Sequence, residues 1–355
     1  LRFECSSLAD WSRIDVSRVP LYLNADAPLA CALHEALTLR VAKTYVRLPG
    51  NAERRPLDAR FAVCGFSQDE ALLPESGSFS GYQLLLEYFS FREKFMSVTL
   101  RGLENVNFPE VLAWFEIDIV LEKQWPHEYA LSEKNLRLHC APVINLFPLE
   151  SDPLHLDSLQ TEYLLRPMRI QDGHTEIYSV DSVTSSRHSG HQMYVPFTSF
   201  RHKGGMLRHD APEYYYHTRV KPGPSGLHDT WLMLGGEAFD NHSVPEHEKL
   251  SLSLTGTNGQ LPRRALQSAL LDTVVKSTAT PIQVRNLCAP TLPCYPPDRD
   301  RFHWRVLSHL GSSFLWMMDN ADVLRGALAL YDWTDNEMNR RRLEAIVDVR
   351  HSEVE

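Results

Sequence analysis

The stretch from Gly65 to Leu103, GFSQDEALLPESGSFSGYQLLLEYFSFREKFMSVTLRGL, constrains the fold more than any other part of the sequence. Pro74 to Ser80 is rich in turn-forming residues, and Ser78 or Ser80 can cap the helix that follows. Apolar side chains recur at helical spacing in two stripes, namely Tyr82, Leu85, Leu86 and Phe89, and Leu84, Tyr88 and Phe91. Only Gln83, Glu87 and Ser90 are left for water, so the pattern predicts a buried helix over residues 80–91.

The same stretch contains none of the patterns that carry chemistry. It has no nucleophile beside a base, no metal-ligand spacing and no phosphate-binding loop. A segment that is dense in aromatic and aliphatic side chains but lacks reactive groups indicates a protein that works through packing and assembly.

Composition excludes several classes of protein. A chain of 355 residues with 43% apolar residues can form two to three domains with buried cores. The formal charge of −9 argues against nucleic-acid binding. The six cysteines show no repeating framework, which is typical of reduced thiols in a cytoplasm. We see no signal peptide and no apolar run long enough to span a membrane. Because the chain begins at Leu1, we expect a longer polypeptide.

Helical and strand patterns alternate in the first part of the chain. Asp26 is placed to cap a helix that has Pro28 in its first turn and an apolar face, which comprises Leu29, Leu33, Ala36 and Leu37. Residues 41–48 follow as a strand. Residues 96–100 and 115–121 alternate between apolar and polar side chains, which predicts two half-buried strands. The apolar run 136–147 around Pro142 predicts a buried turn or short helix.

The rest of the chain is first extended and then helical. Five strands are predicted, at residues 162–165, 176–180, 214–220, 231–234 and 250–254, with an exposed loop within 185–210. A Pro-rich passage at 289–298 precedes three helices. Their apolar residues recur at helical spacing. They are Val306, Leu307, Leu310, Phe314, Met317 and Met318 in the first helix, Leu324, Ala327, Leu328 and Tyr331 in the second, and Leu343, Ile346 and Val347 in the third. Thr334 and Glu337 form a capping-box pattern at the start of the third helix.

These patterns predict an α+β fold with several domains. The first, residues 1–150, is mixed α/β and includes the buried helix at about 80–91. The second, residues 151–285, is β-rich. The third, residues 286–355, is a Pro-rich connection followed by a helical segment.

Two local patterns resemble catalytic motifs. Gly77-Ser78-Phe79-Ser80-Gly81 has the spacing of a nucleophile elbow, but Phe79 stands where a serine is required, so a turn with a helix cap is favoured. Cys140 follows His139 inside the apolar run, where burial would raise the pKa of the thiol and make it unreactive.

Sixteen histidines raise the possibility of a metal site. The candidate pairs are His188 and His191, His242 and His247, and Cys288 and Cys294. None has the spacing of a zinc site, such as C-x2-C or H-E-x-x-H, so surface or interface histidines are favoured. We therefore predict no catalytic residue, no metal ligand and no cofactor-binding residue.

Charged and aromatic groups are also interpreted structurally. Glu116 and Asp118, or Asp298 and Asp300, could act as paired carboxylates of a glycoside hydrolase, but a solvated strand face is favoured for the first pair. The Arg340-Arg341-Arg342 run lies among acidic residues and indicates a salt-bridged helix surface or a partner contact. Large apolar side chains near the C-terminus indicate a core or an interface, with a core as the default: Trp304, Trp316, Met317 and Met318.

The stretch that starts at Gly65 resembles the signature of the TssF family, also called VasA or ImpG, whose members are baseplate subunits of the bacterial type VI secretion system. The resemblance continues in order through six further blocks: LHCAPVINLF (138–147), EYLLRP (162–167), EIYSVDSV (176–183), LSLSLTGTNGQLP (250–262), PTLP with FHWRVLSHL (290–310) and ALALYDW (327–333). It spans most of the chain, which is similar to the central and C-terminal part of that family. Residues 256–259, Gly-Thr-Asn-Gly, depart from the usual Cys-Thr-Asn-Arg, and the segment after Leu310 also differs.

The resemblance implies a structural protein and no enzymatic activity or cofactor. It implies a cytoplasmic baseplate wedge, docked at the inner membrane complex, in which two TssF copies pair with one TssG. The other implied partners are TssK, TssE and a central VgrG spike, and the wedge would support sheath polymerisation and contraction. It implies no nucleic-acid partner and no direct membrane insertion. A different interpretation stays open: a β-rich hydrolase or carbohydrate-binding protein that uses the middle region.

Overall fold

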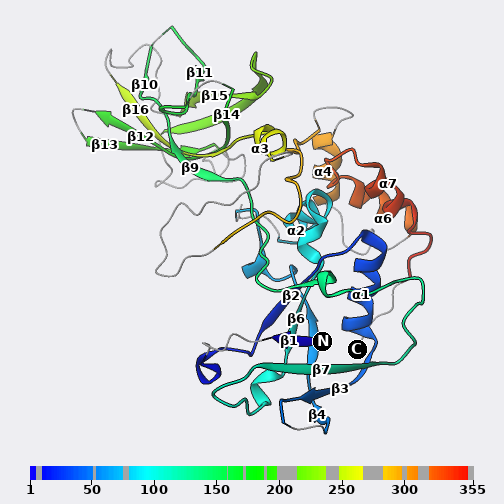
Figure 1. Cartoon of the computed structure of the whole chain (residues 1–355). Coiled ribbons are helices and arrows are strands. Elements are labelled where there is room, and N and C mark those ends of the chain that lie inside the picture. Colours follow the sequence, from blue (N-terminus) through cyan, green and yellow to red (C-terminus); the bar gives the residue numbers. More distant parts are fainter. Residues whose placement is uncertain are drawn as a thin grey trace, which may run out of the picture. The chain divides into compact units, whose positions relative to one another are not determined.

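The computed structural model describes residues 1–4, 10–50, 53–74, 80–157, 159–170, 173–187, 190–197, 214–236, 248–266, 283–297, 302–310 and 320–350. The chain forms two compact units (Figure 1). Unit 1 comprises Leu1–Ile144 and Cys294–Glu355, and unit 2 comprises Asn145–Pro293. Unit 2 is therefore inserted, in sequence, into unit 1. The mixed α+β class is confirmed, whereas the three-domain division stays a prediction.

Two antiparallel sheets of four strands form the lower part of unit 1 in Figure 1. One has the order β1 (Arg2–Glu4), β7 (Trp114–Leu121), β3 (Val41–Arg47), β4 (Arg55–Leu57). The other has the order β5 (Arg60–Val63), β6 (Ser97–Arg101), β2 (Val19–Leu23), β8 (Leu136–Arg137). Both sheets contribute to one hydrophobic core, whose fully buried members include Val98, Leu100, Leu103 and Ile117.

Helix α1 (Ala27–Leu39) packs Leu33 and Leu37 into that core. Asp26 caps it as predicted, because a carboxylate oxygen of Asp26 accepts a hydrogen bond from the amide of Leu29 at 3.4 Å. The predicted alternation in β7 is also confirmed, since Phe115 and Ile117 are buried.

The prediction for β6 was wrong in one respect. The strand is not half-buried, because Thr99 is as inaccessible as Val98 and Leu100 on either side of it. Consecutive side chains of a strand point to opposite faces, so both faces of β6 are covered, while β5 and β2 pair with its two edges. The Thr99 hydroxyl is satisfied there by a 2.9 Å hydrogen bond with the Cys64 thiol, as a buried polar group requires.

The apolar run 136–147 was also predicted wrongly. After the two residues of β8 it continues without a helix or strand until β9 (Phe147–Glu150) begins, and its side chains are largely exposed, with Val143 76% accessible. Apolar composition favours burial only where another element supplies a covering surface, and this run is the connection from unit 1 to unit 2.

Unit 2 contains one sheet of eight strands. Its order is β10 (Leu154–His155), β16 (Lys249–Thr257), β12 (Glu176–Arg187), β13 (Gly190–Pro196), β14 (Tyr215–Pro222), β15 (His228–Gly235), β11 (Tyr163–Leu164), and β9 (Phe147–Glu150) also pairs with β16. All pairs are antiparallel except β13 with β14. Leu250, Leu252 and Leu254 of β16 alternate into a core with Tyr194 and Tyr216.

All five strands predicted for this region are present. The loop predicted within 185–210 is wrong for its first part, because residues up to 196 continue the hairpin of β12 and β13. Residues 198–213 lie outside the described part of the chain. A short helix, α3 (Leu261–Ala265), follows β16.

Four further helices lie in the described part of unit 1: α2 (Ser80–Ser90), α4 (Phe302–Leu310), α6 (Ala321–Ala329) and α7 (Glu337–Glu344). Their positions match the predicted helices, but α7 does not begin with the Thr334 capping box. Asn336 caps it instead by accepting a 2.9 Å hydrogen bond from the Met338 amide, and the Thr334 hydroxyl donates to Asp332. Phe314, Met317 and Met318 lie outside the described residues.

Short 3₁₀ turns connect several of these elements. They are residues Trp11–Arg13, Gln68–Glu70, Arg92–Phe95, Leu103–Asn105 and Glu133–Asn135. The fourth turn begins at Gly102, whose φ of 97° lies in the left-handed region. A Cβ atom at Gly102 would stand 2.3 Å from the carbonyl oxygen of Asp58, which is too close for any side chain.

We expect Gly102→Ala to destabilise unit 1 more than Gly50→Ala does. Both glycines have a positive φ, but a Cβ at Gly50 would meet no atom within 4 Å. The backbone strain of about 1–2 kcal/mol is common to both variants, and overpacking adds about 1–3 kcal/mol at Gly102 alone. Urea unfolding followed by circular dichroism measures the difference, and equal losses would contradict the close approach at Asp58.

Candidate functional site

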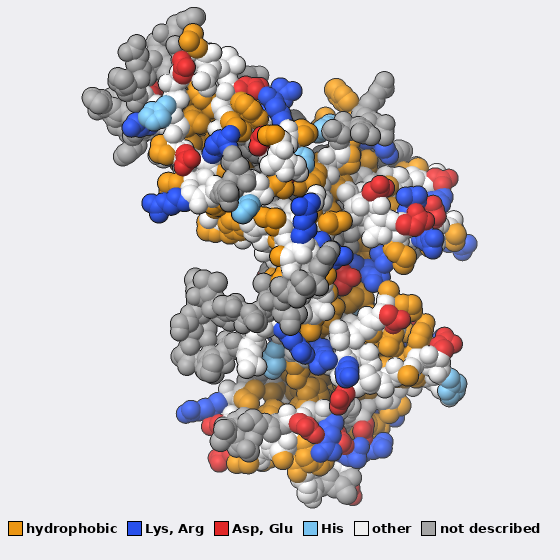
Figure 2. Space-filling model, turned by 45° about the horizontal axis from the view of Figure 1, so that its top comes forward, with side chains coloured by type: hydrophobic (Ala, Val, Ile, Leu, Met, Phe, Trp, Pro, Cys, Tyr) orange, Lys and Arg blue, Asp and Glu red, His pale blue; other side chains and the backbone are white. Residues whose placement is uncertain are grey.

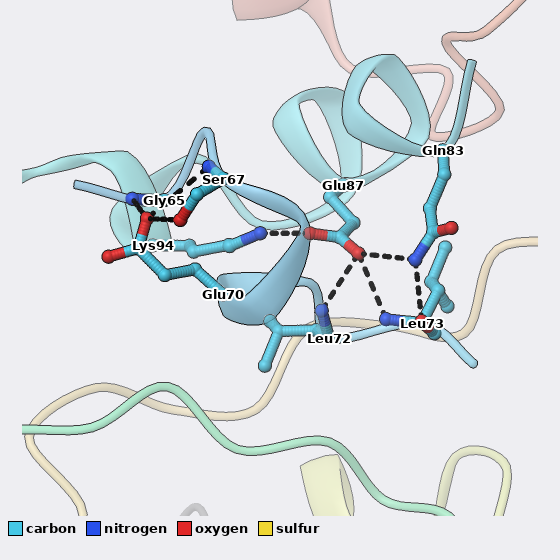
Figure 3. A network of polar contacts seen from close by, with 8 residues as sticks. All are labelled: Gly65, Ser67, Glu70, Leu72, Leu73, Gln83, Glu87 and Lys94. Atoms are coloured by element: carbon cyan, nitrogen blue, oxygen red, sulfur yellow. Dashed lines mark hydrogen bonds and ion pairs between the residues drawn. The ribbon is translucent and has the colours of Figure 1, made fainter. Parts of the chain in front are cut away.

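Helix α2 carries a carboxylate into the interior of unit 1. The Glu87 side chain is 3% exposed and forms an ion pair with the Lys94 ammonium, which is 2% exposed (Figure 3). Glu87 was predicted to face water, so this part of the helix prediction was wrong. Lys94 belongs to the 3₁₀ turn that follows α2, and the pair therefore joins two consecutive elements.

The second oxygen of Glu87 fixes the loop that precedes α2. Oε1 accepts hydrogen bonds from the amides of Leu72 and Leu73, both at 2.9 Å, and from Gln83 Nε2 at 3.4 Å (Figure 3). Two charges removed from water are tolerated only when each is paired and hydrogen-bonded. The network meets that condition for the Glu87 carboxylate.

The balance of these effects sets the pKa of Glu87. Burial alone would raise it, but the hydrogen bonds from Lys94 and from the Leu73 and Leu72 amides, together with the Lys94 charge, outweigh burial and lower the pKa below its ordinary value. Glu87 is therefore held ionised, and both of its oxygens accept hydrogen bonds that position the chain around it.

A second carboxylate organises the start of the same loop. Glu70 Oε2 accepts hydrogen bonds from the Gly65 amide and the Ser67 hydroxyl, both at 2.7 Å (Figure 3). Ser67 and Glu70 form a capping box around the 3₁₀ turn 68–70. Phe66 packs on Phe95 with ring centroids 5.1 Å apart, which closes the loop over the turn that carries Lys94.

The other face of α2 packs against the C-terminal helices. Tyr82 stacks on Tyr331 at 5.3 Å between ring centroids, and His309 of α4 contacts both rings edge-on at 5.7 Å. Burial lowers the pKa of His309 and raises the pKa of the Tyr331 hydroxyl. These three aromatic rings link α2, α4 and the end of α6 in one apolar cluster, which also contains Phe89 and Phe302.

A buried amide fastens α7 to α2. The Asn339 residue is 2% exposed, and its Nδ2 donates to the Phe89 carbonyl at 3.0 Å. The same nitrogen lies within hydrogen-bond distance of Asp332 and Thr334, and its Oδ1 accepts from Arg342 at 2.8 Å. Asn339 thus joins two parts of the chain that are 250 residues apart.

A pocket of about 90 Å³ lies beside the ion pair. Phe66, Gln83 and Leu84 are among the residues that line it, together with Glu87 and Lys94. Because both charges are already engaged with each other, the pocket presents no unpaired charge of this pair to a ligand. The geometry supports a structural role for the network.

Those sequence-predicted candidates that the structure describes are not gathered into a site. Cys140 has a raised pKa because of burial, as expected for an unreactive thiol, although the run around it is exposed. Cys288 is exposed and Cys294 is half-buried, beside Ser90. Several other candidates lie outside the described residues or have side chains that are not described: the Gly77–Gly81 turn up to Phe79, His188, His191, His242, His247, Asp298, Asp300, Trp316, Met317 and Met318.

Glu116 and Asp118 lie on a partly solvated strand face, as predicted. Arg47 pairs with Glu116 at 2.9 Å and with Asp118 at 3.3 Å, and Arg54 pairs with Asp118 at 3.0 Å. The Arg340–Arg342 run also behaves as predicted, since Arg340 and Arg341 form ion pairs with Glu337. Trp304 differs from the default expectation, because it is 71% exposed rather than in the core.

Unit 2 contains two buried carboxylates that the sequence analysis missed. Glu176, 4% exposed, accepts a hydrogen bond from the amide of His228 at 2.7 Å and lies 3.1 Å from its Nδ1. Glu248 is hydrogen-bonded to the Ser185 hydroxyl. Each carboxylate lies next to a strand whose apolar side chains alternate with polar ones. Its hydrogen-bonding partner is far away in the sequence and becomes visible only from the pairing of the strands.

Within the described ranges, no group of three or more His, Cys, Asp or Glu side chains is arranged to hold a metal ion. Among the same residues, no helix is both long and apolar enough to cross a bilayer. On the face shown in Figure 2, Lys and Arg side chains lie among Asp and Glu side chains and do not form one continuous basic area.

A double-mutant cycle tests the coupling of Glu87 and Lys94. We expect Glu87→Leu and Lys94→Met each to lower the free energy of unfolding by about 3–5 kcal/mol, because each leaves a buried charge uncompensated. The double variant should lose less than the sum of the two. As a control, the exposed Glu337–Arg341 pair, 55% and 68% accessible, should contribute at most about 1 kcal/mol. Additive losses at Glu87 and Lys94 would contradict the coupling.

The lowered pKa of Glu87 also predicts a pH dependence. The carboxyl titrates near 4.5 in the unfolded chain and at a lower pH in the folded one. Its stabilising contribution is therefore present above that ordinary value and is lost as the pH falls through the folded pKa. We expect the free energy of unfolding of Glu87→Gln to fall less steeply than that of the unmodified chain as the pH is lowered. The difference in stability between the two chains should therefore shrink in acid. Parallel stability profiles would show that Glu87 does not titrate with folding.

The comparisons with known proteins agree with one another. The family model described as "Type VI secretion system, TssF" matches residues 1–355. A curated relative, the type VI secretion system component TssF1 of Pseudomonas aeruginosa, is 26% identical over 371 residues, which cover 98% of this chain and 59% of the relative.

Two solved structures are similar over almost the whole chain. One is a TssK-TssF-TssG baseplate subcomplex of the type VI secretion system, with a chain that is 58% identical, a TM-score of 0.85, and coverage of 99% of this chain and 64% of that one. The other is a type VI baseplate complex, at 55% identity, a TM-score of 0.63, and coverage of 96% and 59%. This chain thus spans less than two thirds of the length of these relatives, and over its whole length it belongs to the TssF family of the type VI secretion system.

Proposed function

We propose that this chain is a structural component of the type VI secretion baseplate and assembles with TssG and TssK. The observation that carries the proposal is its similarity, over nearly all of its residues, to a chain of a solved TssK-TssF-TssG subcomplex. Further partners follow from the family: a second TssF copy, TssE and a VgrG spike. Its place would be a cytoplasmic wedge, docked at the inner membrane complex, that supports sheath polymerisation and contraction.

The packing of unit 1 suits this role. A subunit that transmits a change of baseplate state by rigid-body movement between its domains needs strong contacts within each domain. The Glu87–Lys94 pair supplies such a contact between two consecutive elements, and the Asn339 contacts supply one between elements distant in sequence. We propose no catalytic step and no cofactor for this chain, because the buried charged groups of the site are engaged with each other or with the backbone.

Co-purification tests the proposal. This chain, carrying an affinity tag, is co-expressed with TssG and TssK encoded beside it, and the captured complex is weighed by native mass spectrometry. We expect TssG to be retained with two copies of this chain for each TssG. Arg264→Ala, a change at an exposed side chain, is the folded control.

Capture of the tagged chain alone would contradict the proposal, provided that circular dichroism shows the chain to be folded. A complex with TssK but without TssG would also contradict it, since the proposed wedge requires TssG.

A further inference from the structure

Two stretches of chain connect unit 1 with unit 2, and each lies between hydrogen-bonded anchors. The first is residues 138–144, which follow β8. The second is residues 291–293, which precede Cys294. Neither contains a helix or a strand. The anchors define where each unit ends and where the chain between the units begins.

The first stretch is fixed at both ends. On the side of unit 1, Arg137 of β8 pairs with Tyr22 of β2. On the side of unit 2, the Asn145 side chain accepts hydrogen bonds from the Asn258 amide at 2.7 Å and the Thr257 hydroxyl at 3.0 Å. Its own amide nitrogen donates to Asn258 Oδ1 at 3.2 Å. Asn145 is thereby fastened to the end of β16 and belongs to the body of unit 2.

Between these anchors the chain is weakly held. Across the described residues, 138–144 form no hydrogen bond with another segment, and the hydrogen bond described within them joins the Cys140 thiol to the Leu138 carbonyl. Val143 is 76% exposed. His139 has a φ of 57°, a left-handed conformation that is unfavourable for a residue with a side chain. A single residue that changes between left-handed and extended backbone redirects the whole chain after it.

The second stretch is much shorter. Arg263 of α3 donates a 3.0 Å hydrogen bond to the Pro290 carbonyl, which holds the chain to unit 2 as far as that residue. The Cys294 thiol is hydrogen-bonded to the Ser90 side chain at the end of α2, in unit 1. Only three residues lie between, and fully extended they span at most about 10 Å. This short connection therefore limits how far apart Pro290 and Cys294 can lie.

We infer that the two stretches form a hinge on which unit 2 reorients as one body, with the His139 backbone as its pivot. Hinges are typically a few loop residues that absorb a large change in φ and ψ while the bodies on either side keep their own contacts. The inference concerns the isolated chain, so its test does not depend on whether the proposed partners bind.

Distances between two spin labels test the hinge. One label is placed at Cys31, exposed on α1, and the other at Val220→Cys, since Val220 is 56% exposed on β14. The other accessible cysteines are replaced by serine. We expect a broad or multiply peaked distance distribution in the unmodified background. A label pair within unit 1, at Cys31 and Val120→Cys, should give one narrow distance.

Two pairs of matched variants locate the hinge. His139→Val should shift the main distance between the units, because a β-branched residue disfavours a positive φ, whereas His139→Asn tolerates it and should leave the distribution in place. Arg263→Ala should broaden the distribution by releasing Pro290. Arg264→Ala should not, because the hydrogen bond described for the Arg264 side chain is to nearby Gln260.

One narrow distance between the units that is the same in His139→Val, Arg263→Ala and the unmodified background would overturn the inference. Equal changes in the two members of each matched pair would also overturn it, since the pivot and the anchor would then have no special role.

Discussion

Much of unit 1 depends on a pair of opposite charges that cannot return to water. Glu87 and Lys94 are almost fully buried, so each requires the other as well as the backbone donors around it. Their network joins the loop 65–73, helix α2 and the turn after it. On the opposite face α2 contacts α4, α6 and α7 through three aromatic rings and through Asn339. The helix is therefore shared by two sets of elements that lie far apart in sequence.

The blocks that carry the resemblance to the TssF family contact one another in the folded chain. Asn145 of the block 138–147 is hydrogen-bonded to Asn258 of the block 250–262. Tyr82 of the first block stacks on Tyr331 of the last. The structure also explains why glycine suits the two positions that depart from the family pattern at 256–259. A Cβ at Gly256 would stand 2.3 Å from the Leu149 side chain, and Gly259 has a positive φ. These blocks are recognisable because they fix packing rather than chemistry.

Periodicity and caps predicted the elements well, including α1 with its Asp26 cap and the five strands of unit 2. What they missed depends on contacts between segments. Glu87 interrupts an apolar helix, and a charge in that position implies a buried partner, but only the fold shows that it is Lys94. Thr99 is buried because both faces of β6 are covered, whereas most side chains of the run 138–144 are exposed. The order of residues along one segment does not show which other segments will cover it.

Native-state hydrogen exchange of Lys94→Met tests most directly whether α2 couples the two halves of unit 1. Elements that open cooperatively share one opening free energy. If α2 is the shared element, the amides of α2 and those of α7, such as Arg340 and Ala345, should lose protection together and by the same amount. Unchanged protection in α7 beside a loss in α2 would contradict the account.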